Sequence, residues 1–328
     1  MDKPEISRRA VLAGVALVLC SGALAQVHAW PSRPVTLVVP ASAGSGTDLM
    51  AREMAIRLGA ELKQTIIVDN KPGASGIIGT QAVVRAAADG YTLLYTNATN
   101  MVMAPALVKN IPYDVTKDLV PVAQTAAGGV VLSVSNDLPV KNLQELVQLV
   151  KANPGKFTYG SWAVGSSGHL TMEWLKRQTG MQMTHVPYRQ VPQLLAELTT
   201  GTLKIGFTDP AAPLPFIASG RVRPIAVTGM VRLPRTPNVP TFAEQGYPFE
   251  PVGWFGVFAP AGTPAAIVQR LNADINRIQQ KSDMVAKVTA MNIEPPPTKS
   301  SEQFRATVLH DLQQWKKIVA DTGITADD

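Results

Sequence analysis

Two long apolar, β-rich runs, at residues 119–134 and 252–259, divide this chain of 328 residues into three parts. Outside and between these runs, short strand-like segments alternate with helix-like ones. Residues 34–40 are rich in β-branched side chains, whereas residues 48–62 have apolar positions at helical spacing. Such alternation is typical of a mostly parallel sheet whose faces are covered by helices. The chain is therefore predicted to leave one α/β lobe, build a second of about 120 residues, and return to the first.

The predicted fold class is α/β, with two α/β lobes joined by two crossover strands and a ligand cleft between them. Residues 30–130 and 253–328 are assigned to lobe 1, and residues 131–252 to lobe 2. Clefts between α/β lobes are lined by loops at strand ends, and two connections permit closure. Further strands are expected at 65–68, 92–95, 157–160, 182–186, 203–207 and 225–227, and further helices at 80–88, 143–151, 169–179, 194–200, 265–280 and 302–320.

Residues 1–29 have the pattern of a cleaved signal peptide. Lys3, Arg8 and Arg9 precede an uncharged, mostly apolar run of sixteen residues, 10–25, which is short for a membrane-spanning helix. Small residues after the apolar core indicate two alternative cleavage sites, before Gln26 and before Trp30, and we favour the second. The paired arginines fit a twin-arginine route or general secretion equally well. We expect a periplasmic protein.

Composition excludes several function classes. Removing the signal lowers the net charge from +6 to +5, with 27 basic against 22 acidic side chains, and these charges are dispersed. Nucleic acid is not expected as a partner, because its binding needs a clustered basic surface. The single cysteine, Cys20, lies in the signal, and the four histidines have no metal-ligand spacing. Neither a metal site nor a cofactor is predicted.

Enzyme motifs are missing from the sequence: there is no G-x-S-x-G elbow, no phosphate-binding P-loop and no H-E-x-x-H. Residues 73–79 (GASGIIG) superficially resemble a dinucleotide-binding loop, but the glycine spacing differs. We interpret them as a tight turn, and we predict no catalytic activity.

The most informative loop is residues 40–48 (PASAGSGTD), between the first strand and the first helix. Helix N-termini present unpaired N–H groups, and glycine lets a carboxylate approach the backbone closely. Two roles are open for Asp48: it caps the following helix, which we favour, or it contacts the ligand.

A second loop of the same kind, residues 159–170 (YGSWAVGSSGHL), lies in the middle block. Two anion-receptive loops in two lobes suit one ligand between them. Trp162 interrupts a run of small residues, so we interpret it as a pocket wall or lid. His169 is a candidate general base, but structural hydrogen bonding is favoured because no acid partner is evident.

The ordered set of motifs along the chain resembles a known family. They are residues 30–36 (WPSRPVT), 47–48 with 51–52, 70–76 (NKPGASG), 89–94 (DGYTLL), 159–161, 165–166 with 169–170, 185–188 (HVPY), 226–228, 239–241, 259–264 (APAGTP) and Trp315. This set is similar to the Bug family, the TctC-like periplasmic solute-binding proteins of tripartite tricarboxylate transporters.

The resemblance implies a periplasmic binding protein of type II that closes on a small carboxylate and delivers it to membrane permease subunits. It implies a monomer, and it leaves open a role in ligand sensing for a sensor kinase. An exported hydrolytic enzyme using His169 or Asp48 is the rival hypothesis.

The implied ligand-binding residues lie at the first loop, the second loop, the segment after residue 187 and the strand end after residue 207. They are Ala41, Ser42, Ala43, Gly44, Ser45, Gly46, Thr47, Asp48, Ser161, Trp162, Val164, Gly165, Ser166, Ser167, Gln190, Thr208 and Asp209. The chain departs from the family pattern at residues 41–43, at Ala163, at residues 189–190 and at Thr208. These departures change the pocket wall, so the family's particular ligands do not transfer.

Overall fold

The computed structural model describes residues 30–188 and 190–325. The predicted signal peptide, its cleavage sites and Arg189 therefore lie outside the described residues. From Arg33 onward the described chain forms one compact unit. None of the helices in these ranges is long and apolar enough to cross a membrane.

The first sheet belongs to what we call lobe 1, and its strand order is β2-β1-β3-β10-β4. β1 pairs in parallel with β2 and β3, while β10 is antiparallel to both β3 and β4. Its strands are β1 (Val35–Val39), β2 (Ile66–Asn70), β3 (Thr92–Asn97), β4 (Leu119–Gly128) and β10 (Gly253–Pro260). The carboxyl ends of β1 and β3 consequently lie at the same edge of the sheet.

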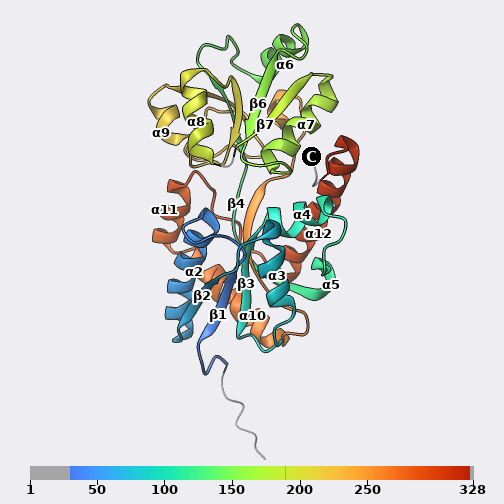
Figure 1. Ribbon diagram of the computed structural model, residues 1–328. Helices are drawn as coiled ribbons and strands as arrows, with labels where there is room; N and C mark the ends of the chain where they lie inside the picture. The colour runs from blue at the N-terminus through green and yellow to red at the C-terminus, as the bar shows by residue number, and fades with distance from the viewer. Residues whose placement is uncertain (1–29, 189, 326–328) are drawn as a thin grey trace, which may run out of the picture. The chain divides into compact units, whose positions relative to one another are not determined.

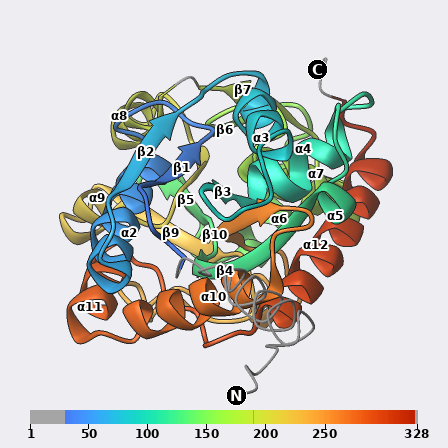
Figure 2. The same cartoon turned by 90° about the horizontal axis from the view of Figure 1, so that it is seen from below.

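Helices lie on both sides of the first sheet, with α2 and α10 in mutual contact on one side and α3 on the other (Figure 2). These helices are α2 (Gly46–Leu62), α3 (Ile77–Val84), α4 (Ala104–Leu107), α5 (Val115–Asp118), α10 (Ala265–Gln279), α11 (Ser282–Ala290) and α12 (Ser301–Thr322), with a short 3-10 turn η2 (Ala74–Gly76) and a π-helical turn η3 (Thr99–Met103).

The second sheet belongs to lobe 2, and its strand order is β7-β6-β8-β5-β9. β6 is parallel to β7 and β8, whereas β5 is antiparallel to β8 and β9. The elements of this lobe are β5 (Val131–Ser135), α6 (Leu143–Lys151), β6 (Phe157–Ser161), α7 (Ser167–Thr179), β7 (Met183–Pro187), α8 (Val191–Thr200), β8 (Ile205–Thr208), α9 (Leu214–Ala218), β9 (Val222–Val227) and η4 (Ala243–Gln245).

Two crossovers connect the sheets, as Figure 1 shows for β4 and the strand beside it, β10. At the first crossover Gly129 packs against the second lobe, since a Cβ added there would lie 2.1 Å from the carbonyl oxygen of Thr228. Thr228 also accepts a hydrogen bond from the Val130 N–H through its hydroxyl, at 2.9 Å. Only glycine fits this close approach.

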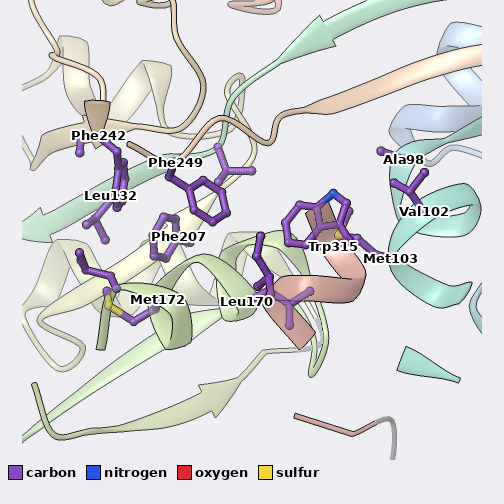
Figure 3. Packing of buried hydrophobic residues seen from close by; sticks show 14 of the residues in the cluster. Ala98, Val102, Met103, Leu132, Leu170, Met172, Phe207, Phe242, Phe249 and Trp315 are labelled. Atoms are coloured by element: carbon purple, nitrogen blue, oxygen red, sulfur yellow. The ribbon is translucent and has the colours of Figure 1, made fainter. Parts of the chain in front are cut away.

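The apolar core continues from one lobe into the other through α12 (Figure 3). Trp315 is buried between Met103 of lobe 1 and Leu170 of lobe 2, and its ring meets Phe249 edge-on at 6.0 Å. α12 contacts both β4 and α7. The last helix, which the sequence assigns to lobe 1, therefore also packs against lobe 2.

Candidate functional site

The first small-residue loop connects β1 to α2, and Ser45 is the N-cap of that helix. The Ser45 hydroxyl accepts a hydrogen bond from the Asp48 N–H at 3.3 Å, and the Ser45 backbone is extended, as an N-cap requires. α2 begins at Gly46, so the expectation that Asp48 caps the helix is wrong. The cap lies three residues earlier because a serine there reaches the free N–H of the first turn.

Asp48 anchors this loop instead. Its side chain is buried and accepts hydrogen bonds from the Gly44 N–H at 2.7 Å, from Arg52 Nε at 3.0 Å and from Asn70 Nδ2 at 3.0 Å. The Arg52 guanidinium is the main cause that lowers the pKa of Asp48 to about 2, with the Gly44 and Asn70 hydrogen bonds adding to it against the effect of burial. Both carboxylate oxygens are thus occupied within lobe 1.

The tip of the loop is open to solvent. Gly44 has a φ of +80°, in the left-handed region that favours glycine, and a Cβ added at Gly44 or Gly46 would meet no atom within 4 Å. The predicted residues of this loop are distributed as follows: Ser42, Ala43, Gly44 and Gly46 exposed, Ala41 and Ser45 half-buried, Thr47 and Asp48 buried. Exposed N–H groups at the start of α2 are therefore accessible to an anion.

The second loop connects β6 to α7 and is held by buried polar contacts. Ser166 is the N-cap of α7, and its hydroxyl accepts from the His169 N–H at 3.3 Å. The Ser161 hydroxyl lies 2.9 Å from Ser166 Oγ and 2.7 Å from His185 Nε2. Ser161, Gly165, Ser166 and Ser167 are buried, whereas Trp162 and Val164 are half-buried. This loop is therefore fixed by its own lobe more tightly than the first.

His169 has the structural role that the sequence favours. Its Nδ1 accepts a hydrogen bond from the Gly165 N–H at 3.0 Å, and its ring stacks on His185 with centroids 3.9 Å apart. Burial is the main cause that lowers the pKa of His185 to about 3, and the neighbouring His169 and Lys176 side chains add smaller electrostatic effects in the same direction. His185 is therefore neutral at ordinary pH and supports Ser161.

The end of β8 supplies the third predicted element. Thr208 is fully buried, and its hydroxyl has no hydrogen-bond partner. Asp209 follows it and accepts hydrogen bonds from the N–H groups of Ala211 and Ala212, at 3.0 and 2.9 Å. Leaving a buried hydroxyl unpaired among the described residues is costly, but Thr208 has no exposed surface, so its hydroxyl is not open to a ligand in this structure.

A pocket of about 150 Å³ lies where the two lobes meet. Of the predicted site residues, Trp162, Ser167 and Asp209 line it. The other lining residues are Asn97, Ala98, Thr99, Met103, Ala126, Ala127, Gly128, Val130, Pro210, Gly253, Trp254, Phe255 and Ile293. Residues 41–48 do not line it, and neither do Ser161, Val164, Gly165, Ser166, Thr208 and Gln190. Gln190 is the exposed N-cap of α8.

Asn97, which was not predicted from the sequence, joins the first loop to this pocket. Its Nδ2 donates to the Thr47 hydroxyl at 3.0 Å, and it is the last residue of β3. A polar residue at the carboxyl end of a parallel strand next to β1 is the signal that would have identified it. Phe255 was also missed, because the sequence does not reveal that β10 lies beside β3.

Comparison with known proteins identifies the family. A family model described as "Tripartite tricarboxylate transporter family receptor" matches residues 50–324. The chain belongs to this receptor family. The TctC receptors are solute-binding proteins of the periplasm and not enzymes.

Curated relatives of this TctC receptor cover nearly the whole chain. A protein named UPF0065 in the tcbD-tcbE intergenic region of Pseudomonas sp. (strain P51) is 34% identical over 99% of this chain and 98% of its own length. Protein BugT of Bordetella pertussis is 35% identical over 93% of this chain and 95% of its own length.

Solved structures share the two-lobe fold. The R. palustris protein Rpa4515 with adipate is 34% identical, with a TM-score of 0.78 over 90% of this chain and 99% of its own. MatC from Rhodopseudomonas palustris with bound malate is 29% identical, with a TM-score of 0.75 over 88% of this chain and all of its own. The periplasmic binding protein BugD is 30% identical, with a TM-score of 0.75 over 90% of this chain and 99% of its own.

Proposed function

We propose that this chain is the extracytoplasmic receptor that closes around a small carboxylate and delivers it to the membrane permease subunits of a tripartite tricarboxylate-type transporter. The observation that carries the proposal is the pocket between the lobes, with a serine-capped helix N-terminus in each lobe beside it. Adipate and malate, named for two structural relatives, belong to the same ligand class.

In this proposal the two lobes, residues 30–130 with 253–328 and residues 131–252, close on the ligand. Residues 41–47 hold one carboxylate through hydroxyls and the backbone N–H groups at the start of α2, since Gly46 leaves that backbone accessible. Residues 161–167, together with Thr208 and Asp209, contact the remainder of the ligand. Asp48 acts indirectly, by fixing the Gly44 backbone.

A titration tests the function directly. Calorimetry against adipate, malate, citrate, glutamate and benzoate should show at least one acid binding with one molecule per chain, and that acid should be recovered unchanged. At a ligand concentration 100 times its Kd, native stability should rise by about 2.7 kcal/mol. A folded protein that binds no carboxylate at millimolar concentration, or one that alters the acid chemically, would contradict the proposal.

We also propose that residues 1–29 are an export signal that is removed. N-terminal sequencing of protein from the periplasm should begin at Trp30, or else at Gln26. Replacing Arg8 and Arg9 with lysine should block export only if the twin-arginine route is used. A chain that still begins at Met1 in a membrane fraction would refute removal of the signal.

A further inference from the structure

The pocket between the lobes has two half-buried aromatic side chains among its lining residues, and they come from different parts of the fold. Trp162 belongs to the loop before α7 in lobe 2, and Phe255 belongs to the crossover strand β10. Met103 and Ile293 add apolar surface to the same pocket. Large apolar side chains at a ligand pocket select the body of the ligand, while a few polar groups orient it.

Each of these two rings is held in place by packing. A Cβ added at Gly168 would lie 3.1 Å from Cζ3 of Trp162, so the indole lies directly over the backbone of the first turn of α7. Phe255 stacks on Tyr95 with ring centroids 6.4 Å apart and planes inclined by 25°. The Tyr95 hydroxyl is in turn hydrogen-bonded to Thr125, at 2.8 Å. Both rings thus pack against neighbouring groups of the protein, and such packing reduces the entropic cost of binding.

The volume of the pocket is compatible with a single six-membered ring. A cavity of about 150 Å³ is large enough to hold one benzene ring. A ring is rigid, so it loses less conformational freedom on binding than a flexible chain of similar volume. Aromatic faces contribute about 0.5–1.5 kcal/mol beyond the area that they bury, which corresponds to about two- to tenfold in affinity.

The pocket beside the first loop has few polar groups, and none of its lining side chains is positively charged. Ser167 is the first residue after the N-cap of α7, and Asn97 and Thr99 face the pocket from lobe 1. Asp209 adds a carboxylate of its own to the lining. A ligand with several carboxylates would bring like charges close to Asp209, which is unfavourable in a partly desolvated site.

We propose that the receptor is selective for carboxylic acids that carry one aromatic ring, and that Phe255 is a specificity-determining residue that holds this ring together with Trp162. The proposal rests on the carboxylate-binding function proposed above and names the class of acid. Tyr95 is a positioning residue, because it acts through the Phe255 ring.

Calorimetry with benzoate, adipate and citrate on the purified chain tests the proposal. Wild-type protein should bind benzoate at least about tenfold more tightly than adipate or citrate. Phe255→Leu should weaken benzoate binding by about two- to tenfold and adipate binding by less than twofold, whereas Phe255→Tyr keeps the ring and should retain the preference. Phe157→Leu is the matched control, because Phe157 is half-buried at the opposite end of β6 from the pocket.

The outcomes separate this inference from the proposed function. If the wild type binds adipate or citrate more tightly than benzoate, the preference for a ring is overturned, but the proposed carboxylate-binding function is not. Equal losses for all acids in Phe255→Leu would show that Phe255 only supports the fold. Absence of binding by every carboxylate would overturn the proposed function itself. The wild-type comparison needs no variant, so it decides the inference even if Phe255→Leu fails to fold.

Discussion

The loops that precede α2 and α7 each connect a strand to a serine-capped helix, but different contacts stabilise them. In lobe 1 the loop tip is exposed and glycine-rich, and a single buried carboxylate, Asp48, fixes it. In lobe 2 the loop is mostly buried and is fixed by hydroxyl and imidazole groups beneath it, with Trp162 at its surface. The comparison suggests a division of roles, in which lobe 1 grips any carboxylate and lobe 2 selects the rest of the ligand.

Filling the open loop should have the largest effect on binding. Gly46→Leu places a side chain in the space where the first loop exposes its N–H groups, and several hydrogen bonds are lost together. Because a Cβ at Gly46 meets no atom within 4 Å, the free energy of unfolding should change little. Calorimetry should show loss of binding for every acid, and chemical denaturation should show an unchanged midpoint.

Ala60→Leu is the control for this variant, since Ala60 is exposed near the other end of α2. It should bind ligand like the wild type. Unchanged affinity in Gly46→Leu would remove the first loop from the site.

The two N-cap serines should differ in what they contribute to stability. Ser45→Ala removes one capping hydrogen bond and should cost about 1 kcal/mol of unfolding free energy. Ser166→Ala also removes the contact with the buried Ser161 hydroxyl, so it should cost more, about 2 kcal/mol. Urea denaturation of both variants measures the difference, and a larger loss for Ser45→Ala would reverse the comparison.

The stabilising contributions of His185, beneath the second loop, and of Asp48, in the first loop, should be lost at different pH. The pKa of His185 is lowered from 6.5 to about 3 in the folded chain, so the unfolded chain takes up the proton first and stability is lost as pH falls from about 6.5 towards 3. The pKa of Asp48 is lowered from 3.8 to about 2, so its contribution is present above 3.8 and is lost as pH falls from there to about 2.

Unfolding free energies measured between pH 2 and 8 test this order. His185→Gln should reduce the loss of stability between pH 6.5 and 4, whereas Asp48→Asn should leave that loss unchanged and should approach the wild type below pH 4. Identical pH profiles for wild type and His185→Gln would show that His185 is not held neutral beneath the second loop.

Both loops could be predicted from sequence because each places small residues between an apolar strand and an amphipathic helix. The capping residue of α2 was misassigned because Ser45 and Asp48 are both good caps and only the backbone at Ser45 decides between them. Phe255 was missed because its place beside Asn97 depends on the antiparallel register of β10 against β3. The contact of α12 with lobe 2 was missed because helical periodicity defines an apolar face and not the partner that covers it.

The most direct test of the division of roles is a calorimetric series of acids on wild type and Trp162→Ala. Trp162 lines the pocket from lobe 2. Its removal should therefore weaken the binding of acids with an apolar or planar body more than the binding of compact, highly charged acids such as citrate. Burying an unpaired carboxylate is expensive, so the wild type should bind acids with an apolar or planar body more tightly than citrate. Equal loss for every acid, or tightest wild-type binding to citrate, would contradict the account.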